Sequence, residues 1–436
     1  MAAELSVDLT TSTVGFLSVI TFVIAYGFVM AEEVTHLRKS KPVILSAGII
    51  WALIASVYIG NKEMAHAVEE ALRHGILEYA ELFLFLLVAM SYINALENRD
   101  VFNALRAYLT SRGYSYKKLF WITGIIAFFL SPIADNLTTA LVLCAVLLAV
   151  GRDNKKFILL GCINIVSAAN AGGAFSPFGD ITTLMVWQKG HLTFFEFFPI
   201  FIPSVVNYIV PAVIMSFAVP NEKPKSTGEI IEMKRGAKRT MALFLLTIVT
   251  AVSFHNFLTL PPMMGMMLGF GYLSLLGYYL KRTHGNHKND GDIKFDILQK
   301  VARAEWDTLL FFFGVILSVA GLGFIGYLAQ INHFMYGELG ATWANVMVGI
   351  LSAIVDNIPV MYAVLTMNPP MPSEQWELIT LTAGVGGSML SIGSAAGVAL
   401  MGQARGMYTF FGHLKWTPVL ALGYAASIYC HILINF

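Results

Sequence analysis

Long runs of apolar residues, separated by short polar segments, recur along the whole chain. Most runs approach the roughly 20 residues that an α-helix needs to cross a bilayer. Lipid offers no partners to backbone N–H and C=O groups, so runs of this kind are expected to be helices. The pattern therefore predicts an all-α polytopic membrane protein. The runs lie at 13–30, 42–60, 76–96, 119–150, 157–187, 199–219, 241–258, 263–280, 306–330, 343–367, 377–402 and 417–435.

The charges of the intervening segments predict how the chain is oriented. If the N-terminus lies outside, the segments on the inner side hold 25 of the 28 Lys and Arg residues. Cytoplasmic loops are enriched in Lys and Arg, so we expect an inner-membrane protein with both termini on the outer, periplasmic side. The composition agrees, because only 13% of the residues are charged, against about a quarter in soluble proteins.

This orientation requires that two of the runs turn back without crossing. The run at 119–150 has basic segments on both sides, and Asp135 and Asn136 divide it into arms of about 15 residues, which are short for a span. A second Asp-Asn pair divides the run at 343–367 in the same way. We therefore predict two re-entrant helical hairpins, with an Asp-Asn pair at each tip, and about ten transmembrane helices.

Each predicted hairpin is followed by a long apolar segment that small and polar residues interrupt. The first, 157–187, contains NAGGAFSPFGDITT, and the second, 377–402, contains GVGGSMLSIGSAAG. Gly-Gly pairs and clustered Ser and Thr residues break the helical hydrogen-bond ladder. Such breaks are tolerated at membrane depth only where they line a cavity or are buried in protein. Both segments are predicted to be discontinuous helices.

The same order of elements occurs twice along the chain. Three spans, a hairpin, a broken helix and a final span occupy 1–219 and again 241–436, and a basic linker that we expect in the cytoplasm lies at 220–240. Since the two halves begin on opposite sides of the membrane, we predict two inverted-topology repeats. Secondary transporters often have this plan, with the substrate site near the midplane where the halves meet.

The interrupted segments contain oxygen-bearing side chains and no Lys or Arg. A carboxylate inside a membrane is costly, so functional roles are expected for these Asp residues. Oxygen ligands suit a hard cation, and a desolvated carboxylate also binds protons. We therefore predict a site where Na⁺ (or Li⁺) competes with H⁺, without a cofactor. Its candidate residues are Asp135, Asn136, Thr138, Thr139, Asn170, Asp180, Thr182, Thr183, Ser352, Asp356, Asn357, Ser391 and Ser394.

The two hairpin tips and the GDITT stretch at Asp180 resemble those of the NhaD-type sodium/proton antiporters of the ion transporter superfamily, which includes arsenite pumps and dicarboxylate transporters. The resemblance extends over essentially the whole chain, and it implies a homodimer with an elevator-like movement. The dicarboxylate branch carries Ser-Asn-Thr at the hairpin tips, and aspartate replaces that serine here, which favours cation exchange. The resemblance further implies that the ion site consists of Asp135, Asn136, Asn170, Asp180, Thr182, Thr183, Ser352, Asp356, Asn357, Ser391 and Ser394, with Na⁺ at Asp135, Asn136, Asp180, Asp356 and Asn357.

Further titratable residues are candidates for a proton path or a pH response: His74, Glu78, Glu81, His191, Glu305 and Asp307. The first three are spaced to share one helix face near the outer start of the third span, where the alternative is that they mark the membrane interface. Glu305 and Asp307 begin a span, where they either complement the helix N-terminus or sense protons. His191 is expected to be an exposed interfacial histidine, although it titrates in the relevant range.

Two other functions remain open. An arsenite or carboxylate transporter of the same superfamily would share this architecture, and an arsenite site would be expected to recruit thiols or neutral hydroxyls. The three cysteines, however, have no metal-ligand spacing and are expected to act as small hydrophobes. The remote alternative is an intramembrane aspartyl protease, because Phe178-Gly179-Asp180 resembles part of the GxGD element, but the Tyr-Asp partner element is missing. We therefore expect a transporter rather than an enzyme, with the lipid bilayer and small cations as its partners and no nucleic acid.

Overall fold

The computed structural model describes residues 8–151, 153–223, 231–283 and 296–436. Every regular element in these ranges is a helix, and ten of the described helices are long and apolar enough to cross a membrane. The protein is thus an all-α polytopic membrane protein, as predicted. Residues 224–230 of the predicted linker lie outside the described residues.

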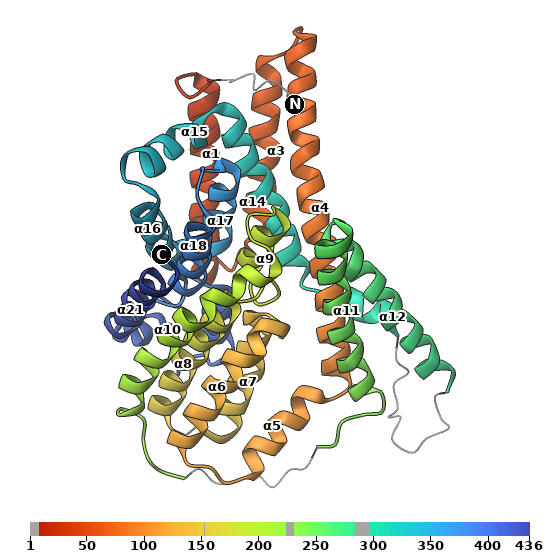
Figure 1. Ribbon diagram of the computed structural model, residues 1–436, viewed down its shortest axis with the longest axis vertical. Helices are drawn as coiled ribbons and strands as arrows, with labels where there is room; N and C mark the ends of the chain where they lie inside the picture. Colours follow the sequence, from red (N-terminus) through yellow and green to blue (C-terminus); the bar gives the residue numbers. More distant parts are fainter. Residues whose placement is uncertain (1–7, 152, 224–230, 284–295) are drawn as a thin grey trace. The chain divides into compact units, whose positions relative to one another are not determined.

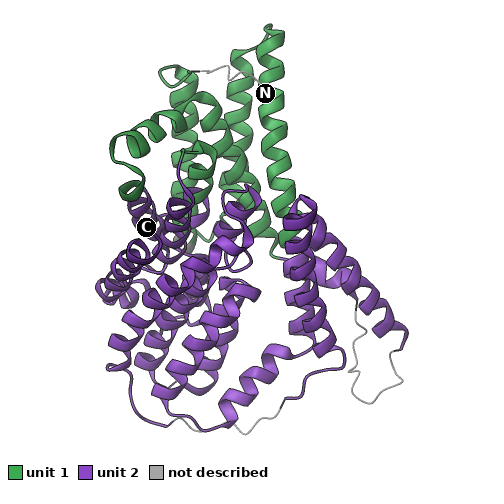
Figure 2. Ribbon diagram, in the orientation of Figure 1, with its two compact units in different colours: residues 1–86, 305–344, 361–370 green, residues 87–304, 345–360, 371–436 purple. Residues whose placement is uncertain are grey.

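The helices form two compact units, which Figure 2 shows in different colours. Unit 1 consists of Met1–Leu86, Glu305–Ala344 and Met361–Pro370, and unit 2 consists of Leu87–Ala304, Asn345–Val360 and Met371–Phe436. Each unit therefore takes residues from both predicted halves of the sequence.

Six helical elements lie wholly within the described part of unit 1, and Figure 1 labels some of them. They are α1 (Thr13–Met30), α2 (Glu32–Thr35), α3 (Ser40–Val57), α14 (Trp306–Ile325), α15 (Tyr327–Asn332) and η2 (His333–Glu338). Three further helices have residues in both units. They are α4 (Lys62–Asn98), α16 (Ala341–Ile354) and α17 (Asn357–Met367).

Unit 2 contains the remaining helices. They are α5 (Val101–Ser111), α6 (Tyr116–Ala134), α7 (Asn136–Gly151), α8 (Lys155–Ala174), α9 (Ile181–Gln188), η1 (Phe194–Ile200), α10 (Phe201–Ser216), α11 (Ala237–Leu258), α12 (Pro262–Arg282), α13 (Ile297–Ala302), α18 (Ser373–Gly386), α19 (Ala395–Gln403), α20 (Phe410–Leu414) and α21 (Thr417–Asn435).

Most long helices correspond to the predicted runs, but several boundaries differ. The first arm of the hairpin at 119–150 is α6, whose 19 residues make it long enough to span. The third predicted span, 76–96, is part of α4, which has 37 residues. This helix already begins at Lys62, so its first turns are polar residues that lie before the apolar run. Breaks at the predicted places divide 157–187 into α8 and α9, and 377–402 into α18 and α19.

Unit 1 is held together by α3 and α14, which pack along each other. Ile50 and Ile54 of α3 are fully buried in its core, and the Trp51 indole Nε1 donates a hydrogen bond of 2.8 Å to the Leu317 carbonyl of α14. A buried indole needs such a partner, since an unpaired donor in an apolar core is costly. The bond therefore fixes how α3 and α14 lie along each other.

Unit 2 is built around α8. Of the most apolar 18 residues of α8, 94% are buried, against 17% for α11. Helices α6 and α7, the arms of the first predicted hairpin, both pack on α8, and so do α10 and α18. This enclosure places the first broken helix where polar groups can be shielded from lipid.

Glycine allows each broken helix to approach the first arm of a hairpin closely. A Cβ atom on Gly172 of α8 would lie 2.1 Å from the Phe128 carbonyl oxygen of α6, and one on Gly386 of α18 would lie 2.1 Å from the Gly349 carbonyl oxygen of α16. Phe128 and Gly349 each precede the Asp of their own hairpin tip by seven residues. The two contacts thus occur at matching positions.

The next glycine of each broken helix approaches the end of the interruption that follows it. A Cβ atom on Gly173 would lie 2.6 Å from the Gly179 carbonyl oxygen, and one on Gly387 would lie 2.6 Å from the Gly393 carbonyl oxygen. Both interruptions therefore fold back on the helix they leave. By this correspondence Asp180, which follows Gly179, matches Ser394, which follows Gly393.

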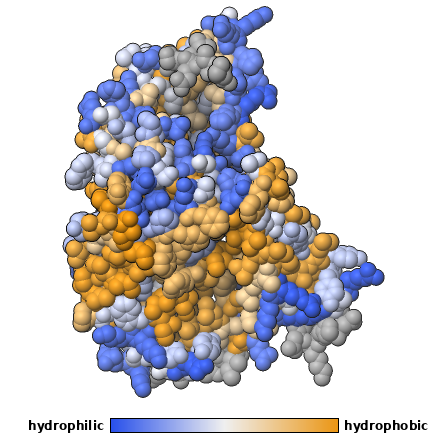
Figure 3. Space-filling view, in the orientation of Figure 1, coloured by the Kyte–Doolittle hydropathy of each residue, from blue (hydrophilic) through white to orange (hydrophobic). Residues whose placement is uncertain are grey.

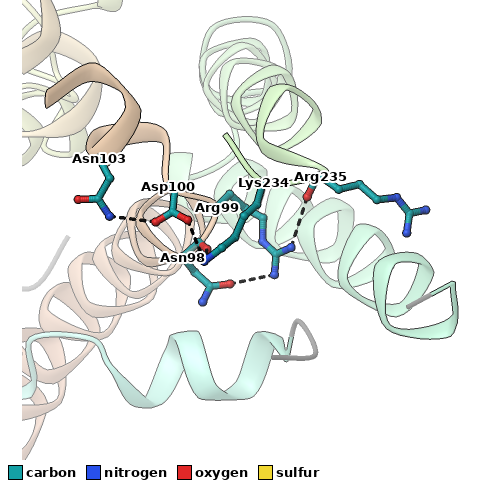
Figure 4. Close-up of polar contacts among 6 residues, drawn as sticks. All are labelled: Asn98, Arg99, Asp100, Asn103, Lys234 and Arg235. Atoms are coloured by element: carbon teal, nitrogen blue, oxygen red, sulfur yellow. Dashed lines mark hydrogen bonds and ion pairs between the residues drawn. The ribbon is translucent and has the colours of Figure 1, made fainter. Parts of the chain in front are cut away.

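The described end of the basic linker is tied to the turn between α4 and α5 (Figure 4). Lys234 forms an ion pair of 2.8 Å with Asp100, which also accepts a hydrogen bond of 2.9 Å from Asn103, and the Lys234 backbone N–H donates to the Arg99 carbonyl at 3.0 Å. Partial burial works against ionisation of Asp100, but the bonds from Lys234 and Asn103 hold its pKa below the ordinary value. The Arg99 guanidinium donates to the Asn98 side chain at 2.9 Å and to the Arg235 carbonyl at 3.3 Å.

Large apolar side chains cover the outer faces of several helices. In unit 2 they include Phe195, Phe198, Ile202 and Phe217, which are at least 48% exposed. Figure 3 shows apolar side chains gathered over the helices of unit 2, with hydrophilic ones at its lower end. Apolar faces of this extent are expected to contact lipid rather than water.

Candidate functional site

The Asp180 carboxylate is the centre of a polar cluster in unit 2. Its Oδ2 atom accepts hydrogen bonds from the side-chain amides of Asn136 at 2.7 Å and Asn357 at 3.1 Å. Asn136 begins α7 and Asn357 begins α17, so the second arms of both hairpins contribute. The Asn136 amide also donates to Asn170 Oδ1 of α8 at 3.1 Å. None of these four side chains is more than 8% exposed.

The backbone around Asp180 fixes the orientation of its carboxylate. Asp180 is the N-cap of α9, and its Oδ1 atom accepts the Thr182 N–H at 3.1 Å. A carboxylate at this position satisfies an unpaired N–H group and lies at the positive end of the helix dipole. The Thr183 hydroxyl donates to the Asp180 carbonyl at 2.7 Å and to the Ser176 carbonyl at 2.8 Å. Thr183 thus provides a hydrogen-bond partner for backbone carbonyls at the helix break.

The Asp residues of the hairpin tips act first as helix caps. Asp135 Oδ1 accepts the Thr138 N–H at 2.8 Å, and its Oδ2 atom accepts the Thr138 hydroxyl at 2.9 Å. Its φ of 58° lies in a region that favours glycine, and such strain is often found at functional sites. Asp356 Oδ1 accepts the Ile358 N–H at 3.4 Å.

The predicted hydroxyl ligands divide into two groups. Ser352 donates to the Ala383 carbonyl of α18 at 2.8 Å, and Ser394 caps α19 by accepting the Gly397 N–H at 3.3 Å, so both already have structural partners. The hydroxyls of Thr139, Thr182 and Ser391, by contrast, are buried and have no hydrogen-bond partner among the described residues.

The arrangement suits a small hard cation. It offers carboxylate, amide and hydroxyl oxygens, and the amides that now donate to Asp180 can present their oxygen instead by rotating. Among the described residues, no three His, Cys, Asp or Glu side chains come together as a metal-binding group. A cation that reaches Asp180 would therefore be held by mixed oxygen ligands, and a proton on the same carboxylate would exclude it.

Some of the predicted proton-path residues lie in unit 1. His74 Nε2 lies 2.8 Å from Glu78 Oε1 on α4, and the Tyr362 hydroxyl of α17 donates to Glu78 Oε2 at 2.9 Å. Glu81 follows on the same helix one turn later. Sequence reasoning missed Tyr362, because its contact joins segments that are 284 residues apart.

The remaining candidates lie at helix ends. Asp307 of α14 accepts a hydrogen bond from the Ser40 hydroxyl, and Glu305 accepts one from Thr308 at 3.2 Å. Both therefore have local partners at the start of α14. His191 is half-buried rather than exposed, because its ring stacks on Trp376 with 3.7 Å between centroids. Burial, with a smaller contribution from the charge of Lys189, lowers the pKa of His191.

Sequence reasoning also missed Glu377, a buried carboxyl of α18. The signal was present, since it is an acidic residue at the start of the apolar run 377–402.

Comparisons with known proteins agree with the resemblance in the sequence. A family model described as "Citrate transporter" matches residues 5–386. The Na(+)/H(+) antiporter NhaD of Vibrio parahaemolyticus is 60% identical over 89% of this chain and 98% of its own length. The proteins of the same name from Vibrio cholerae and Alkalimonas amylolytica are each 56% identical, over 99% and 100% of this chain and 94% and 93% of their own lengths.

Proposed function

This chain belongs to the NhaD family of Na⁺/H⁺ antiporters, and we propose that it exchanges Na⁺ (or Li⁺) for H⁺ by competitive binding at the Asp180 cluster. One observation carries this site assignment: Asn136 and Asn357, one from each hairpin, donate to the same carboxylate oxygen of Asp180. A carboxylate held in this way offers one charge for one cation or one proton.

The exchange cycle follows from this competition. With Na⁺ bound, Asp180 is ionised and supplies a charged oxygen ligand. When a proton binds, the carboxylate loses its charge and the cation leaves. Exchange results if the loaded site alternates between the two faces of the membrane and the empty site does not. Asp135 and Asp356 add two further carboxyl groups at the hairpin tips.

We further propose that the two halves of the chain are inverted repeats with re-entrant hairpins. The matching close approaches of Gly172 and Gly386 to the hairpin arms support this symmetry. The 25 to 3 distribution of Lys and Arg supports an inner-membrane protein with both termini on the periplasmic side. From the resemblance in the sequence we also propose a homodimer in which one part of each subunit moves.

A carboxylate substrate is disfavoured by the residue types at the site. The apolar runs 119–150, 157–187, 343–367 and 377–402, which hold the candidate site residues, contain no Lys or Arg, whereas an anion would need positive charge. One observation favours arsenite as the second candidate: the Sγ atoms of Cys144 on α7 and Cys162 on α8 lie 3.8 Å apart, and arsenite would be expected to recruit thiols.

The test uses inside-out vesicles from a strain that lacks its own antiporters. Respiration generates a pH gradient, and NaCl, LiCl, KCl, arsenite or citrate is then added. We expect Na⁺ or Li⁺ to collapse the gradient, and Asp180→Asn, Asp135→Asn and Asp356→Asn variants at normal membrane levels to lose the response. A Cys144→Ala variant is the matched control and should respond as the wild type does. If no cation has an effect between about pH 6 and about pH 10, cation exchange is wrong; a response to arsenite or citrate would identify the substrate instead.

A further inference from the structure

One buried carboxyl group takes no part in the exchange described above. Glu377 of α18 is 6% exposed, and its Oε2 atom is buried without a hydrogen-bond partner among the described residues. Burying an ionised carboxylate without compensation is costly. This oxygen therefore needs a proton or a nearby cation, which indicates a group that changes its proton content rather than a packing residue.

The groups that face Glu377 add to this need. Glu374 lies one turn earlier on α18, Glu196 belongs to η1, which packs on α18, and the negative charges of both act on Glu377. Like charges nearby favour the form of a carboxyl that carries a proton. The surroundings of Glu377 thus combine burial with two acidic neighbours.

The other elements packed on α18 contribute little charge. Two histidines approach it: His431 of α21, whose Nε2 lies 3.1 Å from the Glu374 carbonyl, and His191, which stacks on Trp376. Helices α9 and α10 contain no charged residue or histidine, and the charged residues of α8 are two lysines in its first turn. Within the described part of the chain, the groups that can offset the acidic cluster are therefore these histidines when they are protonated and Lys189, the C-cap of α9, whose charge acts on His191.

A single short helix connects this carboxyl to the Asp180 cluster. Helix α9 begins directly after Asp180 and has eight residues, a length of about 12 Å. Just beyond its end, His191 stacks on Trp376, the residue before Glu377. Glu377 thus lies at the end of α9 that is remote from Asp180.

On the basis of the proposed exchange, we propose that Glu377 is a second proton-binding residue of the transporter, at the end of α9 remote from Asp180. In one step its carboxyl O–H bond breaks, the proton passes to water and the carboxylate remains; uptake is the reverse. The carboxylate form attracts a cation on its way to Asp180, and the protonated form does not. Glu377 therefore adds its own contribution to the pH dependence of exchange.

The experiment measures the pH profile of Na⁺-driven proton movement in vesicles, from about pH 6 to about pH 10. Glu377→Gln holds the side chain in a neutral form of nearly the same shape, and Glu377→Asp restores a titratable group. We expect the Gln variant to retain exchange but to shift its half-maximal pH by about one unit, a tenfold change in proton concentration, and the Asp variant to recover pH dependence. Glu70→Gln, an exposed carboxyl of α4, is the matched control and should leave the profile unchanged.

Removing the acidic neighbours tests the same idea while leaving Glu377 in place. Glu196→Gln and Glu374→Gln should each make Glu377 easier to deprotonate and move the half-maximal pH downward, and these variants decide the matter if Glu377→Gln does not insert. If the wild type shows no exchange at all, the proposed function fails. If the wild type exchanges normally but none of the Glu377, Glu196 and Glu374 variants moves the profile, or if Gln and Asp at 377 abolish exchange alike, the role assigned to Glu377 is overturned.

Discussion

Asp180 and Ser394 begin the second parts of the two broken helices with nearly the same backbone conformation, with φ and ψ of −148° and 154° against −143° and 149°. Both side chains cap the helix that follows. Asp180 additionally brings a charge, to which both hairpin tips donate. A matching backbone with different chemistry teaches that, at the proposed cation site, only the first half places a carboxylate at this cap, and each half contributes an amide to it.

The Asp residues of the two hairpin tips also differ, in the hydrogen bonds that their carboxylates accept. Asp135 has a φ of 58° and accepts two hydrogen bonds from Thr138. Asp356 is followed by Ile358 and Pro359, and its hydrogen bond to the Ile358 N–H is longer, at 3.4 Å. The local caps of the two tips thus differ, with two bonds to Thr138 at the first tip and a longer bond to the Ile358 N–H at the second.

The largest expected effect comes from substituting the matched cap residues Asp180 and Ser394 one at a time. Asp180→Asn should lower Na⁺/H⁺ exchange at least about a hundredfold, because the cation loses a charged partner that contributes roughly 3 kcal/mol. Ser394→Ala should leave exchange intact and lower the free energy of unfolding by about 1 kcal/mol through the lost cap. Vesicle exchange and thermal unfolding of the purified protein measure the two effects. Equal loss of exchange in both variants would contradict the asymmetry.

Substituting the matched glycines should lower the free energy of unfolding by similar amounts in the two halves. Gly172→Ala and Gly386→Ala each place a methyl group 2.1 Å from a backbone carbonyl oxygen, so a helix must shift, and we expect each to cost about 3 kcal/mol of unfolding free energy. Gly271→Ala on α12, where a Cβ would meet nothing within 4 Å, is the control and should be nearly neutral. A large effect at only one of the two matched positions would show that the backbone symmetry does not extend to energetics.

Removing each of the two amides that donate to Asp180 should weaken the Na⁺ response to a modestly different extent. Asn136→Ala removes a bond of 2.7 Å and the contact to Asn170, whereas Asn357→Ala removes a bond of 3.1 Å. We expect the first to raise the Na⁺ concentration for half-maximal exchange by roughly thirtyfold, or about 2 kcal/mol, and the second to raise it by less. The measurement is a Na⁺ titration at fixed pH. An unchanged value for Asn357→Ala would remove the second hairpin from the site.

The sequence predicted the helices and their breaks, because long apolar runs leave a membrane segment few alternatives to a helix. It also identified every residue of the Asp180 cluster. It did not show that Asp180, rather than Asp135 or Asp356, receives both amides. That convergence depends on how closely α8 and α18 approach the hairpin arms, which is a matter of three-dimensional packing.

The contacts of individual hydroxyls were beyond sequence reasoning for the same reason. Thr183 and Ser352 are predicted ion ligands, and sequence reasoning did not show that their hydroxyls donate to backbone carbonyls near the helix breaks. The Glu78 contact with Tyr362 was also missed, because nothing in the spacing relates α4 to α17. Local patterns therefore predict which elements form, and long-range packing decides which polar atoms meet.

The smallest expected effect concerns two matched serines, one in each hairpin. Ser352 and Ser131 each precede the Asp of their hairpin tip by four residues. Ser352 donates to the Ala383 carbonyl at 2.8 Å, whereas Ser131 donates to the Gly179 carbonyl at 3.5 Å, the limit of a hydrogen bond. Ser352→Ala should lower the free energy of unfolding by about 1 kcal/mol and Ser131→Ala by less than about 0.5 kcal/mol, as measured by thermal unfolding. Both variants should keep the wild-type Na⁺ titration, since neither hydroxyl is needed as a ligand. A weaker Na⁺ response in Ser352→Ala at unchanged stability would instead place this hydroxyl in the cation site and make the second hairpin the richer in ligands.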